Sequence, residues 1–404
     1  MGVRRAAAKR ETGWRAGIVN GAGTDPVRGQ ATEIARGWSA PGAPASWALT
    51  AAIFDALAHD EDLLALAADV PADRLPALLF CASAGYLIAE REPEGLIGYF
   101  PTEGDPQPAV DAAFEPAFRG FCLDHRDELA AVCARRRYQM NDVARTTQVA
   151  LALGVVGRRH PGAKIALIDL GSGAGLGLHP DRYRHLMCDG RQFGDARSRL
   201  TLHCESDGPL APPIPGEMPP IEARIGVDVA PIDVTDPDDL RWARACLPPE
   251  TGSLDRFDRA ARLVAAHPGH LRRGDAIEEL PAILDAIPDD VLPVVTDTYT
   301  AVFFADEQRR RLRQLVRQWG DVRDLVWISL DPLVPLGVEG RHSVQALDVP
   351  ENLVTEYQRD GVFALLGLVS FEHGHGSGTL LARAHPSGTR MRWLDQATGG
   401  AAAV

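Results

Sequence analysis

The spacing of apolar residues changes near position 160 of this 404-residue chain. Before that point, Ala-rich segments such as 47–58 and 61–68 carry apolar residues three and four positions apart, which is typical of amphipathic helices. Asp60 stands where the N-cap of the second segment is expected. The pattern predicts a helical domain over residues 31–156, preceded by a basic, Gly-rich and mobile arm over residues 1–30.

After the linker Gly157–Lys164, short apolar runs alternate with helical stretches. These runs are IALIDL at 165–170, ARIGVDV at 223–229, VLPVVTD at 291–297 and DLVWISL at 324–330. Such alternation indicates βαβ units around a parallel sheet. The apolar runs nearest the C-terminus surround a Gly-rich turn and predict antiparallel strands. We therefore expect an α/β domain over residues 163–400, with a Pro-rich surface insertion at about 206–221.

A glycine-rich loop follows the first predicted strand directly. It reads D-x-G-x-G-x-G from Asp169, and it holds Gly171, Ser172, Gly173 and Gly175. Glycine lets the backbone turn sharply and approach a ligand without a Cβ in the way. The dinucleotide fingerprint G-x-G-x-x-G would need glycine where Leu176 or Leu178 stands. The spacing therefore disfavours a dinucleotide site.

The loop resembles the first motif of class I S-adenosylmethionine-dependent methyltransferases. The resemblance places Asp169 near the amino group of the cofactor's methionine part, with the glycines passing beneath it. RIGVDVAP at 224–231 resembles the second strand of that superfamily, whose terminal acid, here Asp228, binds the ribose hydroxyls. LRRGDAIEELP at 271–281 resembles the third motif, so Asp275 would bind the adenine amine and Ala276 would offer its backbone N–H.

The fold that this resemblance implies is Rossmann-like, with a mostly parallel sheet and antiparallel C-terminal strands. One departure concerns spacing, because Asp169 and Asp228 lie 59 positions apart, whereas about 20 is usual for such acid pairs. LTLHCES, at 200–206, could itself be a strand. Glu205 is then a rival to Asp228 as the ribose-binding acid.

Most of the chain also resembles a narrower group, the domain of unknown function 2332 family. The resemblance rests on YQMNDVAR at 138–145, GSGAGLGLHPDRYRH at 171–185 and GVDVAPIDVTDPDDLRWARACLPP at 226–249. Gly177 stands where asparagine is expected, and TDTYTAVFF replaces a more usual His-Ser pair. The family name carries no activity, so it leaves the chemistry open.

Two polar groups are candidates for substrate binding. Arg182 and Tyr183 follow the glycine loop, where they could bind an acidic or zwitterionic substrate. Asn141, Asp142 and Arg145 share one face of a predicted helix, and they could form a lid over the cofactor's methionine end. Ordinary solvated helix faces are the alternative for both groups.

The implied activity is transfer of a methyl group to a small metabolite, with S-adenosylmethionine as cofactor. Candidate bases are Asp297 and Tyr299 at the end of the fourth strand, and His179 beside the glycine loop. Aminocarboxypropyl transfer and cyclisation use the same cofactor and remain open. A non-catalytic binding protein also remains open, because TDTYT stands where amino-group methyltransferases carry an Asp-Pro-Pro-Tyr type signature.

Charge and composition narrow the partners. A net charge of -13 disfavours nucleic acid, since phosphate backbones are also anionic. The six cysteines form no C-x-x-C pair, and they indicate reduced thiols in a cytoplasm. We expect no secretory signal and no membrane span, since no run of 18 apolar residues occurs. His373 and His375 could share a metal, but a hairpin turn is favoured and no metal is expected; the oligomeric state stays open.

Overall fold

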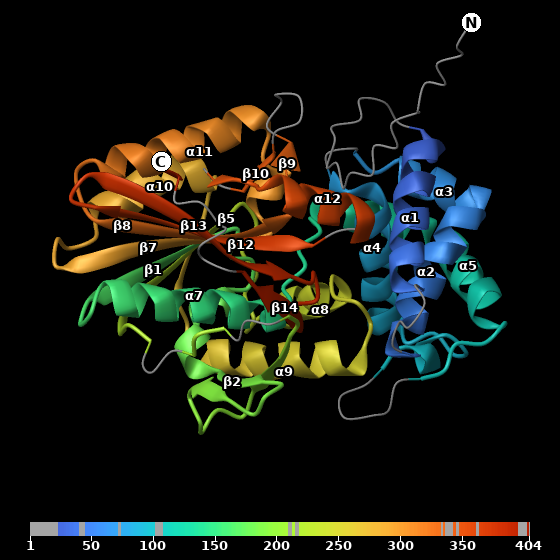
Figure 1. Ribbon diagram of the computed structural model, residues 1–404. Coiled ribbons are helices and arrows are strands. Elements are labelled where there is room, and N and C mark those ends of the chain that lie inside the picture. The colour runs from blue at the N-terminus through green and yellow to red at the C-terminus, as the bar shows by residue number, and fades with distance from the viewer. Residues whose placement is uncertain are drawn as a thin grey trace, which may run out of the picture.

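The computed structural model describes residues 23–39, 45–71, 74–101, 108–208, 212–214, 218–332, 334–335, 342–344, 347–360, 363–394 and 402–403. It is a mixed α/β structure in which a large sheet lies beside a group of helices (Figure 1). The predicted α/β class is therefore confirmed. No helix in the described part of the chain is long and apolar enough to cross a membrane.

The N-terminal helices pack around a core of their own. They are α1 Thr24–Trp38, α2 Ala48–His59, α3 Glu61–Ala68, α4 Pro76–Arg91, α5 Phe114–Asp124 and α6 Arg126–Arg135. Asp60 caps α3, as its position predicts, because its carboxylate accepts from the backbone N–H of Leu63 at 2.9 Å. Helix α1 starts at Thr24, inside the range of the predicted arm, and buries Val27; residues 1–22 lie outside the described part.

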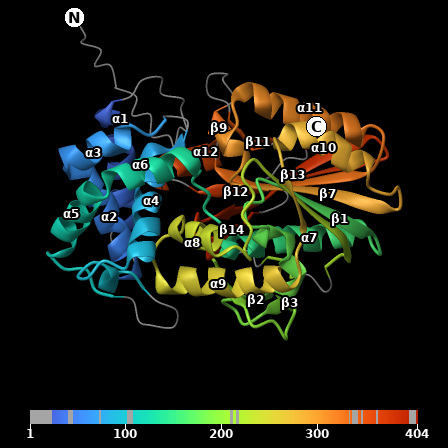
Figure 2. The same ribbon diagram turned by 180° about the vertical axis from the view of Figure 1, so that it is seen from behind.

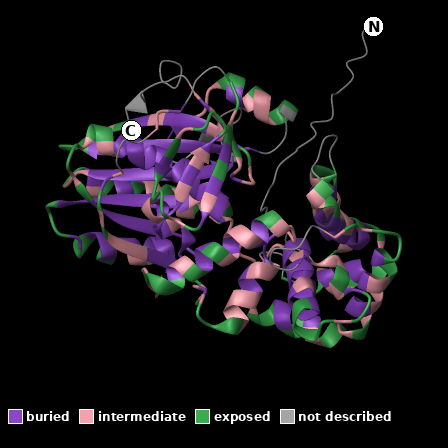
Figure 3. Ribbon diagram, turned by 90° about the horizontal axis from the view of Figure 1, so that it is seen from below, coloured by how far each residue is buried: buried purple, intermediate pink, exposed green. Residues whose placement is uncertain are grey.

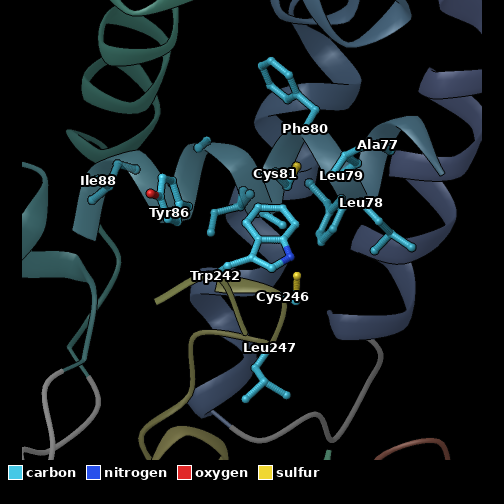
Figure 4. Close-up of a cluster of buried hydrophobic side chains, with 14 of the residues drawn as sticks. Ala77, Leu78, Leu79, Phe80, Cys81, Tyr86, Ile88, Trp242, Cys246 and Leu247 are labelled. Carbon is cyan, nitrogen blue, oxygen red and sulfur yellow. The ribbon is translucent and has the colours of Figure 1, made fainter. Parts of the chain in front are cut away.

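Helices on both sides of the predicted domain boundary pack into the other part. Helix α7 (Thr146–Arg159) belongs to the predicted helical domain, yet its apolar side packs on the sheet. Conversely, α8 (Pro237–Ala245) and α9 (Thr251–Ala266) come from the α/β part and join the helical core. Figure 4 shows Trp242 of α8 lying against α4, close to Cys81 and Leu79. A continuous apolar interface therefore joins the two parts.

Five parallel strands form the centre of the sheet. They are β1 Lys164–Leu170, β5 Ile221–Asp228, β6 His270–Arg273, β7 Val291–Thr298 and β8 Leu325–Pro332. Their spatial order is β6-β5-β1-β7-β8, so the chain builds outward from β1 first on one side and then on the other. The gap between the carboxyl ends of β1 and β7 is therefore the point where the strand order reverses.

Antiparallel strands extend the sheet beyond β8. β12 Ala364–Glu372 and β13 His375–Ala384 form a hairpin, as the apolar pattern near the C-terminus predicts. His373 and Gly374 make its turn with positive φ, in keeping with the hairpin interpretation. The sheet continues through β14 Arg390–Trp393, β4 Thr201–Ser206, β2 Arg184–Met187 and β3 Gln192–Gly194, and β15 Ala402–Ala403 pairs with β13.

Helices cover both faces of the sheet. Helix α7 lies on one face, and α10 (Ala276–Asp285) and α11 (Asp306–Gly320) lie on the other, as both views show (Figures 1 and 2). Strands β1, β7 and β8 are buried along almost their whole length, in keeping with the purple strands in Figure 3, whereas β5 is buried only at its carboxyl end and β6 is partly exposed. Helix α12 (Glu351–Asp360) and a small sheet of β9 Val334–Pro335, β10 His342–Val344 and β11 Leu347–Asp348 complete the fold.

The segment from α6 to α7 connects the helical part to the sheet. Arg136 at its start forms ion pairs with Asp238 and Asp239 of α8. The indole N–H of Trp242 donates to the backbone oxygen of Arg137 at 3.0 Å. These contacts fix the start of the segment, which then crosses the carboxyl ends of β1 and β5 before α7 begins.

Candidate functional site

A small cavity of about 60 Å³ lies where the strand order reverses, at the carboxyl ends of β1 and β7. Open α/β sheets bind their ligands at this position. The polar residues around the cavity come from the α6–α7 segment, the glycine loop and the two strand ends: Asn141, Asp142, Arg145, Thr146, Asp169, Ser172, Thr296 and Thr298. Segments far apart in the sequence therefore meet at one site.

The glycine loop has the backbone conformation that its composition predicts. Gly171, Gly173 and Gly175 all have positive φ, at 73°, 51° and 72°, a region that glycine alone enters without strain. A Cβ on Gly173 would lie 2.1 Å from Oδ1 of Asn141, and one on Gly171 would lie 2.3 Å from Oγ1 of Thr300. The close approach that these glycines permit is thus, in this structure, an approach to the protein's own side chains.

Asp228 ends β5 directly beside the glycine loop. Its Oδ2 accepts from the backbone N–H of Gly173 at 2.9 Å, and its Oδ1 accepts from that of Ala230 at 2.8 Å. Oδ1 also accepts from Nε2 of Gln139, at 2.8 Å. The carboxylate is only 7% exposed. Its place matches the predicted ribose-binding acid, while the chain's own donors occupy its oxygens.

Glu205 is not a competitor for this position. It lies on β4, which pairs with β2 and β14 on the far side of the sheet. Its carboxylate accepts from Nε and a terminal nitrogen of Arg390, at 2.9 and 2.7 Å. The strand at 201–206 does exist, but five strands separate it from β1.

Asn141, Asp142 and Arg145 lie on the α6–α7 segment, which does not form the helix that the sequence pattern predicts. Residues up to Asp142 are irregular, and only Val143–Arg145 form a short 3₁₀ turn, labelled η4. Asp142 caps this turn by accepting from the backbone N–H of Ala144 at 3.0 Å. Asn141 lies over the glycine loop, where its Oδ1 accepts from the backbone N–H of Ala174 at 2.9 Å. Asn141, Asp142 and Arg145 nonetheless reach the cavity, and their roles in binding stay predictions.

Asp169 is the titratable group that the cavity environment perturbs most clearly. Burial raises the pKa of its carboxyl to about 7, and the neighbouring charges of Asp297 and Asp228 act in the same direction. A hydrogen bond from Oγ1 of Thr296, 2.9 Å long, works against this rise. Asp169 can therefore accept or release a proton near neutral pH.

Arg145 and Tyr299 form a stacked pair at the edge of the cavity. The guanidinium lies 3.9 Å from the centre of the Tyr299 ring, and Nε donates to the backbone oxygen of Pro386 at 2.9 Å. Tyr299 has φ of 55°, which is unusual for a bulky residue. Its buried hydroxyl has no hydrogen-bond partner among the described residues. Backbone strain and an unpaired polar group often occur together at functional sites.

Asp297 points away from the cavity. Successive side chains of a strand face opposite sides, so Thr296 and Thr298 face the cavity while Asp297 does not. Its carboxylate accepts from Nε1 of Trp327 at 2.6 Å and from Oγ of Ser329 at 2.9 Å. Both oxygens are engaged within the sheet in this arrangement, and a role for Asp297 as catalytic base stays a prediction.

His179 and Tyr183 are core residues. His179 is fully buried with no partner for either ring nitrogen among the described residues, and burial lowers its pKa to about 3. Tyr183 is also fully buried and donates its hydroxyl to the backbone oxygen of Leu176 at 2.9 Å. Neither residue lines the cavity, and nor does Arg182 in the 3₁₀ turn Pro180–Arg182.

Asp275 lies at the end of β6, next to β5. The backbone N–H of Gly274 donates to the backbone oxygen of Asp228 at 3.0 Å, which holds the two strand ends together. Oδ1 of Asp275 caps α10 by accepting from the N–H groups of Ile277 and Glu278, and Ala276 begins that helix. Asp169, Asp228 and Asp275 thus end three adjacent strands, β1, β5 and β6.

Sequence patterns missed two groups at this site. Thr296 and Thr298 line the cavity, and their alternation about Asp297 was the signal that could have identified them. Gln139 binds Asp228 from an irregular segment that has no periodicity to indicate where its side chain points. Within the described residues, no three histidine, cysteine, aspartate or glutamate side chains gather to hold a metal ion.

Comparisons with known proteins identify a family. One similar solved structure is the magnesium protoporphyrin IX methyltransferase (ChlM) of Synechocystis PCC 6803 with bound SAM, at 12% identity over 56% of this chain and 76% of that one. Its TM-score of 0.21 is too low to establish a shared fold. A search among curated proteins found no significant match. The model of the family described as "Uncharacterized protein conserved in bacteria (DUF2332)" matches residues 35–393, so the chain belongs to the DUF2332 family, as the sequence motifs predict.

Proposed function

We propose that the crevice at the carboxyl ends of β1, β5 and β6 binds S-adenosylmethionine, and that the protein transfers the cofactor's methyl group to a small metabolite. The observation that carries this proposal is the position of Asp228. Its carboxylate ends the strand beside the glycine loop and bonds directly to a loop amide, Gly173 N–H. A carboxylate here can accept from two adjacent hydroxyls, which is what a ribose presents.

The strand order supports a Rossmann-like class I fold. Counted along the chain as first to fifth, the parallel strands β1, β5, β6, β7 and β8 have the spatial order 3-2-1-4-5. Nucleotide-binding α/β domains share this order and bind their ligand at the reversal point. Acids at the ends of the first three strands would then contact successive parts of the cofactor: Asp169 the methionine ammonium, Asp228 the ribose and Asp275 the adenine.

When bound, the cofactor would supply an electrophilic methyl group on its sulfonium. The chain's residues would hold and orient the reactants and keep water away. Asp169, whose pKa burial raises to about 7, would ionise on pairing with the methionine ammonium, and Asp297, Tyr299 and His179 stay predictions as catalytic bases. Arg145 is a buried cation beside the cavity, 7% exposed, and would pair with a carboxylate of the substrate.

A non-catalytic binding protein is the second candidate. The small cavity favours it, since about 60 Å³ holds only a few water molecules. Transfer of the aminocarboxypropyl group, or cyclisation, is a third outcome for the same cofactor. The fate of the cofactor separates these three candidates.

Calorimetric titration tests the cofactor assignment. S-adenosylhomocysteine should bind with micromolar affinity, on the order of -8 kcal/mol, and NAD should not compete. Incubation of the protein with S-adenosylmethionine and a bacterial metabolite extract would then be followed by mass spectrometry. Accumulation of S-adenosylhomocysteine indicates methyl transfer, methylthioadenosine indicates the other transfers, and no turnover indicates a binding protein. Tight NAD binding without any response to the sulfur nucleosides would refute the assignment.

A further inference from the structure

We propose that residues 138–142 are an internal competitor for the cofactor: Gln139 and Asn141 occupy hydrogen-bonding positions that the ligand needs, and binding requires their release. This inference rests on the proposed function and concerns how the same site is regulated. It follows from three observations, at Asp228, at the glycine loop and in the volume of the cavity.

The first observation is the use of Asp228. Its Oδ1 accepts from Nε2 of Gln139 at 2.8 Å, and both its oxygens also accept from backbone amides. A carboxylate has about four lone-pair positions, and three donors already fill most of them here. The backbone donors belong to the loop and to the strand end itself. Gln139 is the one of these three donors that a rotation of its side chain can remove.

The second observation is the contact of Asn141 with the loop. Its Oδ1 accepts from Ala174 N–H at 2.9 Å, and its Nδ2 donates to the backbone oxygen of Gln139 at 3.0 Å. The same Oδ1 lies only 2.1 Å from the position that a Cβ on residue 173 would take. Asn141 therefore takes both the loop amide and the close approach that glycine at 173 makes possible. A polar ligand atom would need that same position.

The third observation is the volume that remains. Sites for cofactors and drug-sized ligands measure roughly 300–1,000 Å³, while this cavity holds about 60 Å³. The strands beneath it are buried in the sheet and cannot retreat. Residues 138–142 are only partly buried and irregular in conformation. The additional volume that a cofactor needs must therefore come from movement of residues 138–142.

Arginines anchor the segment at both ends, and between them Tyr138 and Met140 pack against the helical core while Gln139 and Asn141 bond to the site. Arg136 pairs with Asp238 and Asp239, and Arg145 is fixed by Pro386 and Tyr299. The release therefore involves a local change between these two arginines, and the helical domain can stay docked. If the closed arrangement is favoured about tenfold, the apparent affinity for the ligand falls by about the same factor.

The test compares S-adenosylhomocysteine binding by calorimetry in the wild type, Gln139→Ala, Asn141→Ala and the double variant. The control is Arg137→Ala, an exposed side chain in the same segment. We expect the double variant to bind about tenfold more tightly than the wild type, and the control to match the wild type. Gln139→Glu keeps the side-chain volume and places a like charge beside Asp228, so it should also bind more tightly if the alanine variants unfold.

Hydrogen exchange measured on the wild type supplies an independent readout. Ligand should increase exchange in a peptide covering 138–142 and decrease it over the loop 171–177. The inference is overturned if the variants bind S-adenosylhomocysteine no more tightly than the wild type, or if ligand slows exchange over 138–142. The proposed function still stands in that case, provided that the wild type binds. Absence of binding in every variant and in the wild type would overturn both. Binding by the variants alone would support both.

Discussion

The guanidinium of Arg145 lies 3.9 Å from the centre of the Tyr299 ring, so a residue at the start of α7 is stacked on the residue that follows β7. Nε of Arg145 also donates to Pro386, in the turn between β13 and β14. Three segments distant in sequence thus meet through one side chain at the cavity edge. Arg145 is buried and Tyr299 is half-buried, and this partial removal from water strengthens the attraction between the cation and the aromatic ring.

Replacing Arg145 should affect the reaction more than the cofactor. Arg145→Ala, and to a lesser degree Arg145→Lys, should lower turnover or substrate affinity about tenfold, since lysine cannot stack as a flat guanidinium does. S-adenosylhomocysteine affinity should stay within about threefold of the wild type. Steady-state kinetics and calorimetry measure the two quantities, with Arg158→Ala on the exposed side of α7 as control. Equal losses in both quantities would contradict a role confined to the substrate.

Replacing Asp228 should weaken cofactor binding. Asp228→Asn removes the charged acceptor for the ribose hydroxyls, and we expect a loss of about 2 kcal/mol in binding free energy by calorimetry. Glu205→Gln is the matched control, because Glu205 pairs with Arg390 on the far side of the sheet. The reverse result, with Glu205 important and Asp228 neutral, would show that the cofactor lies elsewhere.

The raised pKa of Asp169 predicts a pH-dependent stability. The folded pKa of about 7 exceeds the unfolded value of 3.8, so folding favours the protonated form. The stability that the protonated carboxyl contributes is fully present below pH 3.8 and is lost as the pH rises to about 7. Above pH 7 the buried, ionised carboxylate destabilises the folded protein, and Asp169→Asn removes this effect. It should raise the free energy of unfolding at pH 8, by at most about 4 kcal/mol, and have little effect at pH 4.

Urea unfolding of Asp169→Asn at several pH values measures this difference. Asp289→Asn, an exposed acid, serves as control and should show no such trend. A gain in stability that is the same at pH 4 and pH 8 would mean that the carboxyl is not protonated in the folded protein.

The buried His179 predicts sensitivity to acid. Its folded pKa of about 3 lies below the unfolded value of 6.5, so folding favours the neutral ring. The free energy of unfolding is therefore highest above pH 6.5 and decreases as the pH falls towards 3. At pH 4.5 the loss from this group is about 2–3 kcal/mol. His179→Leu should lose less stability than the wild type between pH 7 and pH 4.5, as seen in urea unfolding. His203→Gln, an exposed histidine on β4, should behave as the wild type does.

A double-mutant cycle tests the packing of the glycine loop. Gly173→Ala places a Cβ at positive φ and 2.1 Å from Oδ1 of Asn141, and should cost more than about 1–2 kcal/mol of stability. In the Asn141→Ala background the cost should be smaller, because only the backbone strain remains. Additive losses in thermal unfolding would show that the two residues do not touch.

Local signals in the sequence were sufficient for the centre of the sheet. Ile165–Leu170 is an uninterrupted apolar run followed by glycines, and the strand, its burial and the positive φ values of the loop all follow from that. Asp228 could also be located, since ARIGVDV is a second apolar run with an acidic residue near its end. Excluding Glu205 needed the pairing of β4 with β14, which is a contact between distant residues and leaves no local pattern.

The orientation of side chains at the site could not be predicted as well. Asn141, Asp142 and Arg145 have helical spacing, yet asparagine and aspartate side chains bond to nearby backbone and favour the start of a helix over its interior. Asp297 ends a strand as expected, but whether it or its threonine neighbours face the cavity depends on one residue of strand register. The burial of His179 depends on the whole fold around it.

The pairing of β14 with β4 has a consequence for the newly made chain. Arg390 lies beside Glu205, which leaves the ribosome 185 residues earlier. Helices α1 to α6 contact one another within the first third of the chain and can pack during synthesis, whereas β4 must wait for β14 with one edge unpaired. A nascent chain that stalls before Arg390 therefore exposes a strand edge that invites association with other chains.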